Sequence, residues 1–62
     1  MLPLREIPMQ LKLFCKECKE IRIHEFSGFA RFGYMYRCKF CGRIQILTEQ
    51  EVVIYKSLQE HM

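Results

Sequence analysis

Several residue types are scarce or absent in this 62-residue sequence. There is no tryptophan, and the chain holds only three glycines and two prolines. Without tryptophan, a packed core has to draw its large rings from phenylalanine and tyrosine. Serine occurs only twice, at Ser27 and Ser57, and we expect no enzyme built on a serine nucleophile.

Long hydrophobic runs are also missing. The first ten residues include Pro3, Arg5, Glu6 and Pro8, and no apolar run reaches the length of a secretory signal or a membrane span. We therefore expect a cytoplasmic protein in a reducing setting, with no membrane partner. Half of the residues are hydrophobic and no low-complexity tract is present, which excludes a disordered tail.

The chain is long enough for one small domain only. A chain of about 60 residues buries only about 60% of its unfolded surface, so its hydrophobic gain barely exceeds its entropy cost. Domains of this size usually need a covalent or metal cross-link. A structural zinc ion can supply it, because its binding contributes about 10–16 kcal/mol in peptide models.

Four cysteines are placed to provide such a cross-link. They are Cys15, Cys18, Cys38 and Cys41, which form the pattern C-x2-C-x19-C-x2-C. Two intervening residues allow one tight turn to present two sulfurs to the same metal, and two such turns complete a tetrahedron with Zn–S distances of about 2.3 Å. We predict one structural zinc ion.

Other uses of the four cysteines remain open. Two disulfides are favoured in secreted proteins, and a CxxC pair can serve redox chemistry or a zinc reservoir. A redox site needs only one CxxC pair, however, and a four-cysteine zinc leaves no open position for a catalytic water. His24 or His61 would have to replace a cysteine to change that. We expect no enzyme.

The remaining sequence predicts a small antiparallel sheet. Apolar and polar residues alternate in four segments, which we expect to be strands. Glycines and a serine predict a turn over 27–33. Two prolines predict an extended arm over 1–10, whose Leu2, Leu4, Ile7 and Met9 cover the core or a partner. The predicted strands are 11–14, 20–26, 34–38 and 43–48.

A helix is predicted over residues 49–61. Thr48 and Glu51 have the spacing of a capping box at its start. Val52, Tyr55, Leu58 and Met62 lie near one stripe of that helix, which we expect to pack on the sheet. The run from Val52 to Tyr55 also suits a strand.

The second cysteine pair is followed directly by a glycine, in Cys38-Lys39-Phe40-Cys41-Gly42. In this feature, and in the two CxxC pairs joined by a predicted hairpin, residues 11–48 resemble the zinc-ribbon family. The resemblance implies a metal-stabilised β fold of three to four short strands, here between the arm (1–10) and the helix (49–62). Lys19 departs from the pattern, because glycine often follows the first pair. Zinc ribbons serve in transcription, ribosome, enzyme and adaptor proteins, so the resemblance does not fix a function.

Basic charge is concentrated in the predicted metal-binding body. The formal net charge is +3, but residues 11–47 carry eight basic and three acidic side chains, whereas residues 48–62 are net acidic. Lys16, Lys19, Lys39 and Arg43 lie beside the cysteines and can balance their charge. The other candidates interleave arginines with aromatic rings, a pattern typical of surfaces that bind single-stranded nucleic acid. These nucleic-acid-binding candidates are Arg22, Phe29, Arg31, Phe32 and Arg37.

Two functions follow as expectations. The first is a non-enzymatic zinc module that binds nucleic acid, or works within a transcription-type or translation-type machine. The second is a protein-interaction adaptor that uses the apolar arm and C-terminal segment to dock on a larger protein or to form a homodimer.

Overall fold

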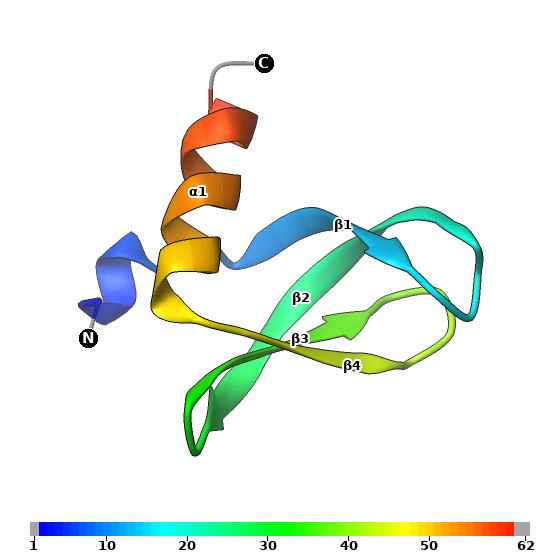
Figure 1. The fold of residues 1–62 in the computed structure, drawn as a ribbon, viewed down its shortest axis with the longest axis horizontal. Helices are drawn as coiled ribbons and strands as arrows, with labels where there is room; N and C mark the ends of the chain where they lie inside the picture. The colour runs from blue at the N-terminus through cyan, green and yellow to red at the C-terminus, as the bar shows by residue number, and fades with distance from the viewer. Residues whose placement is uncertain (1, 61–62) are drawn as a thin grey trace.

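The molecule is a small four-stranded antiparallel sheet with one C-terminal helix, as predicted. The structure, a computed structural model, describes residues 2–60. The strands pair in chain order, β1-β2-β3-β4. Figure 1 shows the β1–β2 and β3–β4 loops together at one end of the sheet, and α1 at the other. The elements are the 3-10 turn η1 (Leu4–Glu6), β1 (Gln10–Cys15), β2 (Glu20–Ala30), β3 (Gly33–Cys38), β4 (Ile44–Leu47) and α1 (Glu49–Glu60).

The predicted turn over 27–33 is wrong in its extent. Strand β2 continues to Ala30, because Ser27 is accommodated as an extra residue between the pairs Phe26–Tyr36 and Gly28–Met35. Such a β-bulge needs unusual backbone angles, and Gly28 supplies them with φ at +144°. The true turn is Arg31-Phe32, between the paired residues Ala30 and Gly33.

The N-terminal arm also differs from its prediction, because part of it is not extended. Residues Leu4–Glu6 form a 3-10 turn, and Ile7 is then buried in the core. Two tyrosines fix this segment, since the Leu2 amide donates to the Tyr34 hydroxyl at 3.0 Å and the Tyr36 hydroxyl donates to the Pro8 carbonyl at 2.9 Å. The arm therefore belongs to the fold.

Helix α1 starts at the predicted capping box. The Glu51 carboxylate accepts from the Thr48 amide at 3.0 Å, and the Thr48 hydroxyl accepts from the Glu51 amide at 3.2 Å. The run Val52 to Tyr55 is helical rather than extended. The predicted stripe is only partly correct: Val52 is fully buried and Tyr55 packs on the core, but Leu58 is 62% exposed. Met62 lies outside the described residues.

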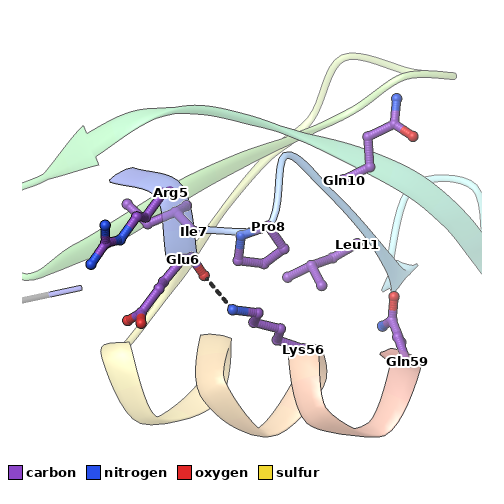
Figure 2. Close-up of a pocket in the computed structure, with 8 residues that line it drawn as sticks. All are labelled: Arg5, Glu6, Ile7, Pro8, Gln10, Leu11, Lys56 and Gln59. Carbon is purple, nitrogen blue, oxygen red and sulfur yellow. Dashed lines mark hydrogen bonds between the residues drawn. The ribbon is translucent and has the colours of Figure 1, made fainter. Parts of the chain in front are cut away.

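Polar contacts tie α1 to the arm and to the edge of β1. The Lys56 ammonium donates to the Glu6 carbonyl at 2.9 Å, across a hollow of about 330 Å³ shown in Figure 2. The side-chain oxygen of Gln59 accepts from the backbone amide of Lys12, and the side-chain nitrogen of Gln59 donates to the Lys12 carbonyl, both at 2.9 Å. Gln59 thus takes the place of a neighbouring strand and protects this edge from other chains.

The hydrophobic core lies on one face of the sheet, which we call the inner face. Both central aromatic residues are tyrosines, and the phenylalanines are at best partly buried. The helix and the arm each contribute one buried side chain. The core cluster consists of Ile7, Leu11, Leu13, Tyr34, Tyr36, Leu47 and Val52. No helix within residues 2–60 has the length and apolar character needed to cross a membrane.

Gly33 is required by the close approach of β4. A Cβ atom at this position would lie 2.4 Å from the Leu47 carbonyl oxygen, a backbone atom that cannot move alone. We predict that Gly33→Ala lowers the free energy of unfolding by about 1–3 kcal/mol. Urea unfolding at fixed metal concentration measures this. The neighbouring Phe32→Ala, at an exposed side chain, should change it by less than about 0.5 kcal/mol; equal effects would contradict this account.

Candidate metal centre and hairpin surface

The structure brings all four cysteine sulfurs together. Within residues 2–60, Cys15, Cys18, Cys38 and Cys41 form the one group with metal-ligating atoms this close, with all Sγ atoms within 4.8 Å of one another. The Cys15 and Cys41 sulfurs, from different loops, are 3.4 Å apart. Four sulfurs at about 2.3 Å from a central zinc would be about 3.8 Å apart, so the cluster has the right size for one ion.

Each cysteine pair sits in the same kind of turn. The Lys19 amide donates to the Cys15 carbonyl at 2.7 Å, and the Gly42 amide donates to the Cys38 carbonyl at 2.9 Å. Both turns end on a residue with positive φ, +56° at Lys19 and +83° at Gly42. Lys19 thus adopts the left-handed conformation that glycine adopts easily, so the departure from the ribbon pattern leaves the turn intact.

Backbone amides prepare two of the thiols for ionisation. Burial acts to raise the pKa of Cys38, but the amides of Cys41 and Phe40 outweigh it and lower the pKa to about 6. The Cys41 amide lies 3.5 Å from the Cys38 sulfur. The pKa of Cys15 is lowered as well, chiefly by the Cys18 amide.

The other two thiols are shifted the opposite way. Burial and the neighbouring sulfurs raise the pKa of Cys18 to about 12. The Arg43 amide acts to lower the pKa of Cys41, but the Cys15 sulfur, burial and the Cys38 sulfur together raise it. Four thiolates this close repel one another, so a cation is needed before all four can ionise. The donor set therefore suits a divalent metal that prefers sulfur.

His24 does not join the cysteine cluster. His24 is fully buried, its Nδ1 lies 2.8 Å from the Arg22 carbonyl and its Nε2 lies 3.2 Å from the Gln45 amide nitrogen. The same Gln45 nitrogen donates to the Phe14 carbonyl at 2.6 Å. His24 and Gln45 together connect β1, β2 and β4 close to the end of the sheet that carries the four cysteines, which we call the metal end. These contacts make the histidine a structural residue. His61 lies outside the described residues.

The basic residues beside the cysteines are exposed, with one cross-link between the two loops. Lys16, Lys19, Lys39 and Arg43 all face solvent, and Arg43 pairs with Glu17 at 3.1 Å. This pair joins the first cysteine loop to the segment that follows the second. A pair between such exposed groups contributes little to stability, so the sulfurs remain the principal link between the loops.

Three of the five nucleic-acid candidates lie together at the tip of the β2–β3 hairpin. Phe32 is 84% exposed, with the Arg31 guanidinium 5.7 Å from its ring centre. Phe29 is partly exposed and packs edge-on against Phe26 and Tyr34, with ring centres 5.3 and 5.5 Å apart. A hollow of about 230 Å³ separates this tip from the start of α1.

The other two candidates lie elsewhere. Arg22 is eight residues from the tip along β2, roughly 25 Å in a strand, and is salt-bridged to Glu20 at the metal end. Its guanidinium stacks 4.2 Å from the ring centre of Phe40, a contact that we did not predict. Arg37 is opposite Glu25, on the face opposite the core. The five residues therefore do not form one surface.

Comparisons with known proteins add no family. No protein-family model matches the chain, and neither a curated protein nor a solved structure matches it. The four clustered cysteines on a small antiparallel sheet fit a zinc-ribbon-like fold on geometry alone.

The two left-handed positions give opposite predictions for stability. Gly42→Ala should lower the free energy of unfolding by about 1–2 kcal/mol, because alanine is strained at positive φ while its Cβ has room at 3.6 Å. Lys19→Gly relieves strain and should be neutral or raise stability by up to about 1 kcal/mol. Urea unfolding at fixed zinc concentration measures both. A neutral Gly42→Ala would contradict the turn geometry.

Acid should release the metal. A thiolate with a lowered pKa contributes stability that is fully present above its ordinary pKa of 9.0 and is lost as the pH falls through about 6. A bound metal competes with protons and moves this loss to lower pH. We predict that zinc release, followed with a chromogenic chelator, rises steeply as the pH is lowered below about 6. Metal retention that does not depend on pH between 7 and 4 would contradict thiolate ligation.

Proposed function

We propose that this protein is a non-enzymatic module in which one structural zinc ion holds a hairpin that binds single-stranded nucleic acid. Cys15, Cys18, Cys38 and Cys41 would hold the zinc. Four sulfur ligands fill its tetrahedron, so the ion orders the fold and does no chemistry. The thiols must stay reduced to bind metal, so a reducing cytoplasmic setting is part of this proposal.

The observation that carries the proposal is the exposed Arg31–Phe32 pair at the hairpin tip. Among the large apolar side chains of residues 2–60, that of Phe32 is the most exposed. Phe32 lies in a two-residue turn, and such a turn needs no aromatic ring. An exposed ring offers a stacking platform for a base, and the adjacent guanidinium can follow the phosphate. Phe29 forms the base of the same surface.

A protein-docking role is the second candidate, and the structure changes its surface. Ile7 and Val52 from the two predicted docking segments are used in the core. The outward side of α1 nevertheless keeps three exposed apolar residues, Val53, Ile54 and Leu58. An amphipathic helix usually presents polar residues to solvent, so this side of α1 favours a protein contact.

The test for nucleic-acid binding compares matched residues. The zinc-loaded protein is titrated with short single-stranded RNA and DNA across a salt series, read by fluorescence anisotropy. Phe32→Ala should weaken binding about 5-fold to 150-fold, the equivalent of 1–3 kcal/mol per stacked base. Arg31→Ala should weaken binding and reduce the salt slope by about 0.7.

Two controls locate the contact. Phe40→Ala removes an exposed ring at the metal end, and Arg37→Ala removes an arginine from the face of the sheet opposite the core. Neither residue lies at the hairpin tip, so each variant should keep its affinity for single strands within about 2-fold of the wild type. No binding at low salt, or the same loss in Phe40→Ala as in Phe32→Ala, would contradict the proposal.

A further inference from the structure

The face of the sheet opposite the core is strongly apolar, and no helix or strand within residues 2–60 covers it. Directly paired residues point to the same side of a sheet, so the register assigns this outer face. It carries three charged side chains, Lys12, Glu25 and Arg37. Its apolar residues are Phe14, Ile21, Ile23, Met35, Ile44 and Ile46, all more than 40% exposed except the half-buried Met35.

Such a face is unusual for a sheet open to water. Antiparallel sheets with one solvated face normally alternate apolar residues inward with polar residues outward. Here β4 places both Ile44 and Ile46 outward, at 48% and 60% exposure. Contiguous exposed apolar patches on this scale mark interaction sites.

The outer face has an ordered pattern of apolar and charged rows. Met35 is opposite Ile46 towards the hairpin tip, and Phe14 is opposite Ile21 towards the metal end. Between these apolar rows lie two others, in which Lys12 is opposite Ile23 and Glu25 is directly opposite Arg37. One acidic and one basic residue thus sit side by side in the middle of the face.

We propose that a second copy of this chain packs on the outer face, sheet against sheet, about a two-fold axis that runs parallel to the strands and passes between Glu25 and Arg37. That axis places Glu25 against the partner's Arg37 and Arg37 against the partner's Glu25. The apolar rows on either side then meet apolar rows of the partner. Two sheets packed face to face lie about 10 Å apart, which leaves room for one interdigitated layer of isoleucines.

A dimer interface of standard size would use a modest share of this chain's surface. A standard interface buries about 800 Å² on each partner, about a sixth of the 4755 Å² that this chain exposes. The described Cα atoms span 30 × 30 × 16 Å, so the molecule is a thin plate with broad faces. A self-complementary face on a plate favours a two-fold dimer that closes on itself.

The first experiment measures mass against concentration. The zinc-loaded wild-type protein should sediment as a monomer–dimer equilibrium in analytical ultracentrifugation. Ile23→Lys with Ile46→Lys should weaken dimerisation at least 10-fold. Leu58→Lys, an equally exposed position on the outward side of α1, should leave it unchanged. A strictly monomeric wild-type protein at about 100 µM (well above the micromolar range of ordinary dimers), or loss of dimer in Leu58→Lys, would overturn the proposal.

The second experiment tests the charged row itself. Glu25→Arg and Arg37→Glu each place like charges together in their own homodimers and should weaken them. Mixed together, the two variants should form a heterodimer in which every contact across the axis pairs opposite charges, detected by native mass spectrometry. A mixture with no preference for the heterodimer would overturn the two-fold arrangement, while zinc content and dispersed amide signals verify folding.

These outcomes are separable from the proposed nucleic-acid contact. The outer-face variants change no residue of the hairpin tip, and Phe32→Ala changes no residue of the outer face. If the outer-face variants lose the dimer while the monomer keeps its affinity for single strands, the outer face serves dimerisation alone. If Phe32→Ala keeps the dimer but loses nucleic-acid binding, the hairpin tip serves nucleic-acid binding alone.

Discussion

The convergence of four sulfur atoms from two loops is the constraint on which the rest of the molecule depends. Within residues 2–60, seven buried side chains make up the core cluster, and a core this small supplies little stability by itself. The sulfurs join the loops that follow β1 and β3, at the end of the sheet far from α1. Amide hydrogen bonds lower the pKa of two of the thiols, and burial and close sulfur neighbours raise the pKa of the other two. A divalent cation would resolve this conflict, and we therefore propose that fold and metal depend on each other.

The proposed metal cross-link also bears on the surface. It would fix the sheet without a large core, so that aromatic and aliphatic residues can remain exposed. Phe32 projects from the hairpin tip, and isoleucines cover the outer face. These two surfaces lie on different parts of the sheet, one at its tip and one across its broad face. The two proposed contacts are therefore separate, and neither includes a cysteine.

The features predicted from sequence are those set by local chemistry. Cysteine spacing, strand alternation and the Thr48–Glu51 capping box each depend on residues close in the chain, and each is present. The errors arise where distant packing decides. Ser27 and Gly28 form a bulge rather than a turn because β3 continues to pair beyond them. The arm turns at Leu4–Glu6 instead of staying extended, and Tyr34 and Tyr36 fix it from another strand.

The candidate binding residues show the same limit. Arginines and aromatics interleave along the chain, but strand alternation and strand length separate them in space. Arg22 lies at the metal end, Arg37 on the face opposite the core and Phe32 at the hairpin tip. Phe40 was missed because its contact with Arg22 joins a turn to a strand eighteen residues earlier. The apolar outer face was missed because Ile21, Ile23, Ile44 and Ile46 also satisfy the pattern of a core-facing strand. Sequence alternation shows that residues share a face, but not which face is covered.

The most direct test of the central claim is native mass spectrometry of the purified protein, paired with an amide correlation spectrum before and after chelation. The account predicts one zinc ion per chain, four reduced thiols, and collapse of the dispersed amide signals when the zinc is removed. A metal-free protein that keeps its dispersed spectrum, or a mass showing two disulfides, would contradict it.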